Sequence, residues 1–191
     1  MFIVDWIILK KVYIKENKSI IHLYSKEFWK ISAWIKESKL KYPVDLWNII
    51  NVWINIKWNI NNIDSYKIKK TLNYNNLSFE SIQNILELIT YLYRLIPEWV
   101  PSESLFDEYI EIMELLEKNE TNKRWSEFYK LKLVIKSWIW LHWEKSENFK
   151  KIIEFSKNNK ITKMMQIKWI SENLLNEITK YNFDSYSLYL T

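Results

Sequence analysis

The stretch that decides the fold of the N-terminal part is Ile50-Asn51-Val52-Trp53-Ile54-Asn55-Ile56-Lys57-Trp58-Asn59-Ile60. Aliphatic residues occupy every second position from Ile50 to Ile56. This period of two predicts a β-strand with one buried face. A new apolar run starts at Ile60, directly after a short connection, so the stretch is expected to form a hairpin.

Four further segments of residues 1–72 have the length and composition of strands. They are bounded by Val4 and Val12, Ile20 and Tyr24, Ile31 and Ile35, and Ile60 and Ile68. Together with the strand around Ile50–Ile56 they make five short strands. Five strands in a small domain that is rich in lysine predict an OB-fold barrel over residues 1–72.

From Ser78 onward the apolar period becomes helical. Ser78 and Ser102 are suitable N-caps for two helices, and a third is expected over 126–139. Shorter helices are predicted around 146–157, 160–168 and 171–181. The inward face of the first helix is predicted to carry Ile82, Ile85, Leu86, Ile89, Tyr93 and Ile96. The predicted fold class is therefore α+β, with the five-stranded OB-fold barrel followed by an all-helical domain over 78–191.

The composition has one anomaly: the chain has 191 residues, no glycine and 12 Trp. A chain of this length ordinarily has roughly 13 glycines, at about 7% of residues. Glycine is the residue that adopts a positive φ at little cost, so a globular chain without it is physically implausible. The Trp excess equals the glycine deficit, so we expect most Trp positions to be glycines encoded by UGA codons that were translated as Trp.

The places where Trp occurs agree with this interpretation. Trp29, Trp58 and Trp99 lie at expected turns or helix ends, where glycine is common. Three others, Trp6, Trp34 and Trp53, fall within expected strands, where glycine marks bulges. Strained backbone is therefore predicted at such positions. The alternative is a genuinely Trp-rich protein that binds carbohydrate or a membrane interface, and it predicts exposed, coplanar Trp rings.

Several function classes are disfavoured by the composition. There is no Cys, which excludes disulfides and a cysteine zinc site. His22 and His142 belong to no metal-ligand motif, and no phosphate-binding loop is present even with glycine at the Trp positions. We expect no enzymatic activity, no cofactor and no metal. No apolar run approaches the ~18 residues of a membrane span, and the N-terminus lacks a basic signal region, so a cytoplasmic protein is expected.

Charge is distributed unevenly along the chain. Residues 1–72 carry 13 Lys and Arg against 6 Asp and Glu, whereas residues 73–191 carry 15 against 17. A lysine-rich surface caused only by an AT-rich genome would affect both parts alike. The basic excess of the predicted barrel instead indicates a polyanion-binding module.

The predicted nucleic-acid-binding residues are lysines of the barrel, which would neutralise phosphates without reading sequence. They are Lys10, Lys11, Lys30, Lys36, Lys39, Lys41 and Lys57, with the segment 36–41 as the first choice. Aromatic side chains that could stack on bases are Tyr13, Tyr24, Phe28 and Tyr42.

With glycine at the Trp positions, several short motifs resemble the RecO family of DNA repair proteins. They are Asp5-Trp6-Ile7-Ile8-Leu9-Lys10, Trp29-Lys30-Ile31-Ser32-Ala33, Leu95-Ile96-Pro97-Glu98-Trp99, Ser104-Leu105-Phe106 and the stretch from Lys130 to Leu141. They occur in the family's order and cover roughly residues 1–141. Two departures are the missing four-cysteine zinc site and a short tail over 144–191 that matches loosely.

The resemblance implies a recombination mediator associated with the nucleoid. Such a protein binds single- and double-stranded DNA, anneals complementary strands and helps to load recombinase onto strands coated by single-strand-binding protein (SSB). The implied partners are RecR and the C-terminal tail of SSB. The remaining alternative is an OB-fold protein that binds RNA or single strands in another role.

Overall fold

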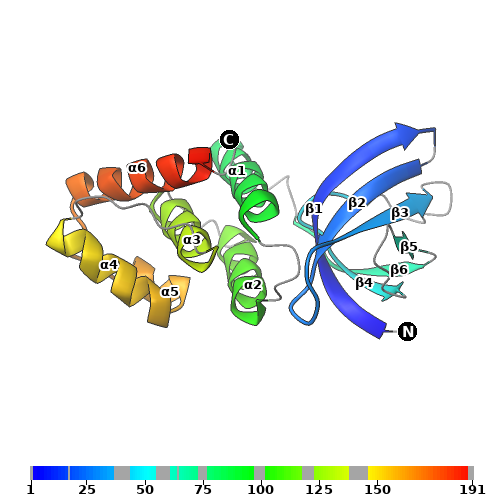
Figure 1. Cartoon of the computed structure of the whole chain (residues 1–191), viewed down its shortest axis with the longest axis horizontal. Coiled ribbons are helices and arrows are strands. Elements are labelled where there is room, and N and C mark those ends of the chain that lie inside the picture. Colours follow the sequence, from blue (N-terminus) through cyan, green and yellow to red (C-terminus); the bar gives the residue numbers. More distant parts are fainter. Residues whose placement is uncertain are drawn as a thin grey trace. The chain divides into compact units, whose positions relative to one another are not determined.

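The computed structural model describes residues 2–16, 18–36, 44–54, 61–63, 65–72, 77–96, 102–117, 123–137 and 146–188 (Figure 1). The chain forms two compact units. The first comprises residues 1–76 and 97–110, and the second comprises 77–96 and 111–191. These units differ from the predicted domains 1–72 and 78–191, because the first part of one helix belongs to the first unit.

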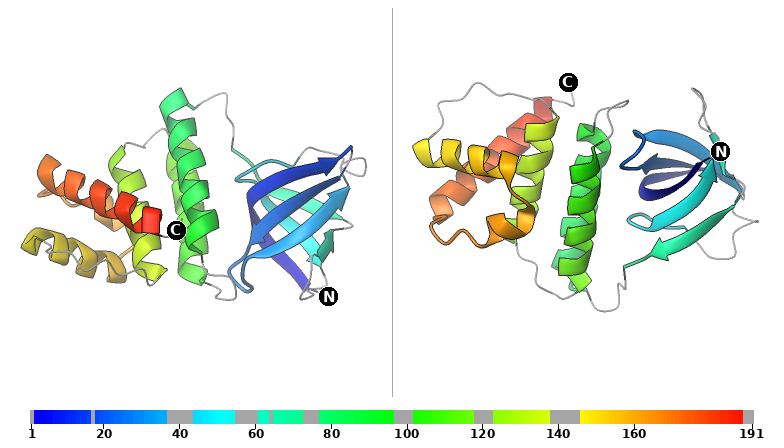
Figure 2. Two further views of the ribbon diagram at one scale, coloured as in Figure 1. Left: turned by 45° about the horizontal axis from the view of Figure 1, so that its top comes forward. Right: turned by 90° about the horizontal axis from the view of Figure 1, so that it is seen from below.

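The first unit contains a curled, mixed sheet that forms a half-barrel (Figures 1 and 2). Its strands are β1 (Phe2–Lys15), β2 (Lys18–Tyr24), β3 (Ile31–Lys36), β4 (Ile49–Ile54), β5 (Asn61–Ile63) and β6 (Tyr66–Lys70). Across the sheet they lie in the order β5-β3-β2-β1-β4-β6. The α+β prediction is confirmed, but the sheet has six strands and not five. The predicted fifth strand is divided, because Asn61–Ile63 pairs in parallel with β3 whereas Tyr66–Lys70 pairs antiparallel with β4.

The long strand β1 holds the sheet together. Its first half, from Phe2 to Ile7, pairs with β4, and its second half, from Ile7 to Lys15, pairs with β2. The register with β2 shifts between Ile8 and Lys10, and such an irregularity lets a strand bend. A second shift in the same ladder lies between Tyr13 and Lys15, whereas the ladder with β4 shows no shift at Trp6, where a glycine bulge was predicted.

The core of this unit lies on the inner face of the sheet. Strand β3 alternates between buried and half-buried residues, and Ile50, Val52 and Ile54 of β4 are all buried. The alternation predicted for the opening stretch is thus confirmed in β4; Ile56 lies outside the described residues. On the other face of β2 and β3, Lys18 and Lys36 are exposed and the residues between them and the strand ends are half-buried.

The helix α2 (Glu103–Glu117) belongs to the first unit up to residue 110. The Tyr24 hydroxyl donates a hydrogen bond to the carbonyl oxygen of Ser102, at 2.7 Å. The Tyr109 hydroxyl donates another to the carbonyl oxygen of Trp47, at 3.2 Å. These two bonds fasten the start of α2 to the sheet, which explains why the unit includes residues beyond the predicted boundary.

The second unit is helical and is organised around α3 (Lys123–Lys136). This helix contacts α1 (Phe79–Leu95), α4 (Glu147–Asn158), α5 (Ile161–Met165) and α6 (Glu172–Leu188). Every residue from Trp125 to Val134 is buried, as expected of a helix that is packed on all sides.

The predicted start of α1 is confirmed, since Ser78 accepts a hydrogen bond from the Ser81 backbone N–H at 3.1 Å. Its predicted inward face was partly wrong. Leu86 is 42% exposed, whereas Leu88 and Leu92 are buried. The buried stripe of α1 is therefore rotated relative to the predicted one and includes residues that the periodicity did not single out.

Two observations bear on the predicted glycines. Trp47 has a φ of 61°, and among the described residues it is the one with a positive φ. The indole Nε1 atoms of Trp6 and Trp125 are buried and have no hydrogen-bond partner, although a buried Trp N–H usually finds one. The strained turn is at Trp47, which the sequence did not single out, and the described Trp29 has no positive φ. Trp58 and Trp99 lie outside the described residues.

A pair of variants tests whether position 47 requires glycine. Trp47→Gly and Trp47→Ala both remove the ring, so their difference reports the backbone alone. We expect the Gly variant to be more stable than the Ala variant by about 1 kcal/mol, because φ is positive. Urea unfolding measures the difference, and the same pair at Trp6, within β1, is the control. There glycine should be the less stable by about 0.5–1 kcal/mol. Equal stabilities at position 47 would contradict the glycine interpretation.

Candidate nucleic-acid interface

Some lysines of the first unit are neutralised by acidic side chains. Lys69 Nζ lies 2.7 Å from Asp5 Oδ2, and Asn51 Nδ2 donates to Asp5 Oδ1 at 2.8 Å. Lys26 Nζ lies 3.7 Å from Glu103 Oε1. The Asp5 carboxylate thus ties β1 to β4 and β6. The charges of Lys69 and Lys26 are already compensated, so neither is a strong candidate for binding phosphate.

The predicted lysines do not form one cluster within the described residues. Lys10 is exposed on β1, and Lys30 is half-buried just before β3. Lys11 is also half-buried, and its Nζ donates to the carbonyl oxygen of Val44 at 3.2 Å. Lys36 is exposed at the end of β3. The other predicted lysines lie outside the described residues: Lys39, Lys41 and Lys57.

Lys36 has two lysine neighbours that do not belong to the predicted set. In the β1–β2 ladder Lys15 is opposite Lys18, and in the β2–β3 ladder Lys18 is opposite Lys36. These three residues therefore form one transverse row across three strands, which we name the lysine row. Residues directly opposite in an antiparallel pair have Cβ atoms about 4.5–5.5 Å apart. Three positive charges are thus held close together on one end of the sheet.

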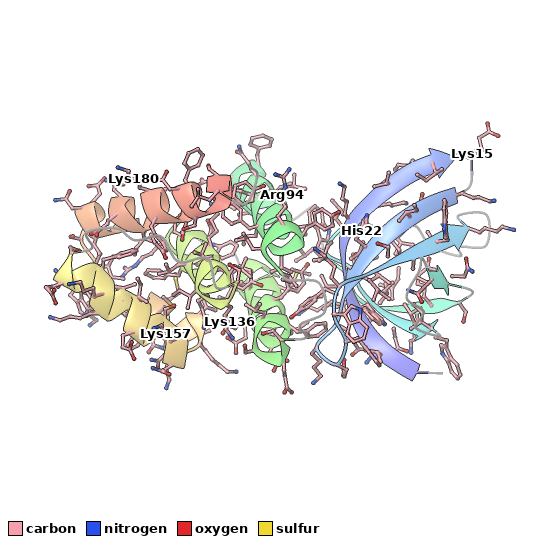
Figure 3. The ribbon with its side chains drawn as sticks, in the orientation of Figure 1. Lys15, His22, Arg94, Lys136, Lys157 and Lys180 are labelled. Atoms are coloured by element: carbon pink, nitrogen blue, oxygen red, sulfur yellow. The ribbon has the colours of Figure 1, made fainter. Side chains whose placement is uncertain are left out.

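The lysine row has no acidic partner among the residues that the structure describes. None of Lys15, Lys18 and Lys36 takes part in an ion pair, and Glu16, in the β1–β2 turn, pairs with none of them. Like charges placed directly opposite each other destabilise a sheet. Figure 3 shows Lys15 at the end of β1. An anion bound at this place would remove the repulsion, so the row is the best candidate for contact with phosphate.

A pocket of about 560 Å³ adjoins the lysine row. All three lysines line it, and the remaining lining residues are Ile14, Trp34, Ile35, Asn62 and Ile63. Trp34 is opposite Ile20 on β2 and Asn62 on β5, so the pocket lies where β5 joins the sheet. The aromatic ring of Trp34, the side-chain amide of Asn62 and three lysines thus line one pocket.

The aromatic residues predicted to stack on bases differ in their exposure to solvent. Tyr13 is 69% exposed, with Lys11 Nζ 4.7 Å from its ring centre. Tyr24 was a wrong prediction, because its ring is buried and its hydroxyl bonds to Ser102. Burial also raises the pKa of the Tyr24 hydroxyl above its ordinary value. Phe28 is half-buried, and its ring stacks on Trp6 at 6.0 Å. Tyr42 lies outside the described residues.

A signal for the missed lysines was present in the sequence. Lys15 and Lys18 flank Glu16-Asn17, a two-residue connection between two apolar runs. Had this connection been interpreted as a hairpin, the antiparallel register would have placed Lys15 opposite Lys18. The pairing of Lys36 could not be foreseen in this way, because it depends on the register between β2 and β3.

Other kinds of site find no support in the described part of the chain. No three His, Cys, Asp or Glu side chains there lie close enough together to hold a metal ion. His22 Nδ1 instead shares a hydrogen bond of 2.9 Å with the Ser32 hydroxyl. Each helix that the structure describes is too short or too polar to cross a lipid bilayer. A scan of the chain against protein-family models gives no match, and a search of curated proteins gives no significant match either.

Proposed function

We propose that the chain is a non-enzymatic, DNA-binding recombination mediator of the kind that the RecO resemblance implies. The lysine row carries this proposal. It places three uncompensated positive charges, Lys15, Lys18 and Lys36, on the open end of a sheet. Such an arrangement suits the sequence-independent binding of a phosphate backbone.

The pairing of the strands supports the more specific proposal of an OB-fold. Strand β1 pairs on both sides, and the segment from β5 to β6 reaches β3 with its first part and β4 with its second. The two edges of the sheet are therefore linked by one interrupted strand. A five-stranded, partly open barrel with its fifth strand broken would give this pairing. OB-folds bind oligonucleotides on the face of their second and third strands and on adjacent loops, which is where the lysine row lies.

Annealing of two complementary strands requires no proton transfer and no nucleophile. It requires that the repulsion between two phosphate backbones be screened while the bases remain free to pair. Lysines suit this role, because their flexible ammonium groups act as point charges and impose little geometry. We further propose RecR and the C-terminal tail of SSB as partners, on the resemblance alone; binding of each to the purified chain is the direct test.

Salt-titrated binding of single-stranded DNA tests the function. In the triple variant Lys15→Gln, Lys18→Gln and Lys36→Gln, the slope of log affinity against log salt should flatten by about two units. Each phosphate neutralised on a single strand contributes about 0.7 to this slope. The matched control replaces three exposed lysines of the second unit, Lys151, Lys163 and Lys168, by Gln. It removes the same charge and should leave the slope nearly unchanged.

An annealing assay with complementary oligonucleotides completes the test. The wild-type chain should accelerate annealing, and the triple variant should not. An unchanged slope in the triple variant would overturn the interface. Binding to RNA as tight as to DNA, without annealing, would replace the repair function by RNA binding. Among the Trp side chains that the structure describes, Trp6, Trp47 and Trp125 are buried, and such buried rings do not suit the carbohydrate-binding alternative.

A further inference from the structure

We propose that the pocket beside the lysine row binds a single nucleotide by its terminal phosphate, so that the chain recognises phosphorylated ends of DNA strands. The inference rests on the proposed DNA-binding function and adds the chemical class of ligand that the pocket takes. Three observations carry it: the charge of the row, the size of the pocket and the nature of its lining.

The charge favours a terminal phosphate over an internal one. A phosphate monoester carries about −1.5 to −2 charges at neutral pH, whereas each internal phosphodiester carries one. Lys15, Lys18 and Lys36 are adjacent in the ladders and have no acidic partner in the described part of the chain. Three cations that line one pocket match a dianion better than one monoanionic link of a strand. The compensated Lys69 and Lys26 offer no such site elsewhere on the sheet.

The size of the pocket favours one nucleotide. Its volume of about 560 Å³ lies within the range of pockets that enclose a small ligand, about 300–1,000 Å³. A strand that crosses the sheet would need a groove lined along its length, with cations at the spacing of successive phosphates. Here the three cations surround one space, and a strand end can enter such a space without passing through it.

The lining supplies contacts for the sugar and base. Trp34 is one of the positions where glycine is expected; in this structure its half-buried ring presents an apolar surface on which any base can stack. Ile14 of β1, which is 45% exposed, adds a second apolar surface to the pocket. The Asn62 amide, opposite Trp34 on β5, can both donate and accept hydrogen bonds at a base edge. Stacking without a rigid hydrogen-bond pattern predicts little base preference.

The test compares one single-stranded oligonucleotide with a 5′-phosphate, with a 3′-phosphate and with hydroxyls at both ends, each bound to the full chain. At least one phosphorylated form should bind about tenfold tighter than the hydroxyl form, the ratio that one charge-assisted hydrogen bond provides. In Lys18→Gln the ratio should fall towards one. The matched control is Lys67→Gln, an exposed lysine of β6 outside the pocket. It removes the same charge from the same unit and should keep the tenfold ratio.

Free nucleotides separate a strand end from a small-molecule ligand. Calorimetry with a nucleoside monophosphate and with the corresponding nucleoside should give binding of the phosphate form alone, weaker than that of the phosphorylated oligonucleotide. If the monophosphate binds as tightly as the oligonucleotide, the pocket is a nucleotide site and end recognition is overturned. If all three oligonucleotides bind equally, the pocket proposal fails while DNA binding stands. If no oligonucleotide binds but the monophosphate does, both the DNA-binding function and end recognition fail, and the pocket is a site for free nucleotides.

The variant Trp34→Gly separates the contribution of base stacking from that of phosphate binding by the lysine row. Loss of the ring should weaken binding of all three oligonucleotides alike, because stacking on the base is lost in each. The ratio between phosphorylated and hydroxyl forms should persist, because the lysines are unchanged. The same variant represents the chain in which position 34 is a glycine. A ratio that disappears in Trp34→Gly would show that the phosphate is not held by the lysine row, and would overturn the assignment.

Discussion

Lys130→Met is expected to lower the free energy of unfolding of the second unit by about 3–5 kcal/mol, the cost of removing one partner from a buried ion pair. Lys130 is 4% exposed and Glu127 is 3% exposed. Lys130 Nζ lies 2.8 Å from both Glu127 Oε1 and Glu87 Oε1. Asn182 Nδ2 on α6 donates to Glu127 Oε2 at 2.9 Å. The network joins α1, α3 and α6, so its loss leaves a buried carboxylate without its cation.

Chemical unfolding followed by far-ultraviolet circular dichroism measures this effect. The control is Lys150→Met, which removes a lysine from another i,i+3 pair of the same unit. Lys150 and Glu147 are 58% and 78% exposed, and an exposed pair contributes at most about 1 kcal/mol. The double variant Lys130→Met, Glu127→Met should recover much of the lost stability, since no uncompensated charge remains in the core. Equal effects of Lys130→Met and Lys150→Met would contradict the buried network.

The fold class could be predicted because the alternation of apolar residues in the strands and their helical period after Ser78 are local properties of the sequence. Alternation in Ile50–Ile54 and the cap at Ser78 depend on neighbouring residues, and both are confirmed. The division of the fifth strand could not be predicted in this way. The first half of 61–70 pairs with β3 and the second half pairs with β4. This choice of partner strand is set by residues far away in the chain.

The prediction of polyanion binding remains a prediction, and the lysine row differs from the set of lysines that the sequence suggested. An excess of lysine in the first 72 residues indicated polyanion binding, yet the row that the register assembles shares only Lys36 with the predicted set. Composition counts charges but does not say which are compensated. Asp5 neutralises Lys69 across 64 positions of sequence, and no local pattern reveals such a pair. The strained Trp47 was missed for the same reason, since the turn is held by its bonds to Ile8 and Tyr109.

Alanine substitutions at two adjacent positions of β2 are expected to differ in their effect on stability, because the two side chains lie on opposite faces of the sheet. Ile21 is fully buried on the inner face, and Ile21→Ala should lower the free energy of unfolding by about 2–5 kcal/mol through lost burial and the resulting cavity. Ile20 is half-buried on the outer face, opposite Trp34. Ile20→Ala should cost about 1 kcal/mol, in proportion to the smaller area that it covers.

Denaturant unfolding and oligonucleotide binding, measured on both variants, connect this difference to function. Ile20 lies between Lys18 and the half-buried His22 on the open face, so Ile20→Ala should leave the protein folded and retain the salt dependence of binding. Ile21→Ala should bind DNA normally only at temperatures where the sheet remains folded, because the lysine row exists only in the paired strands. If Ile20→Ala were as destabilising as Ile21→Ala, the outer face would be covered by protein and not available to a ligand. The proposed interface requires that the two faces differ, and this comparison decides whether they do.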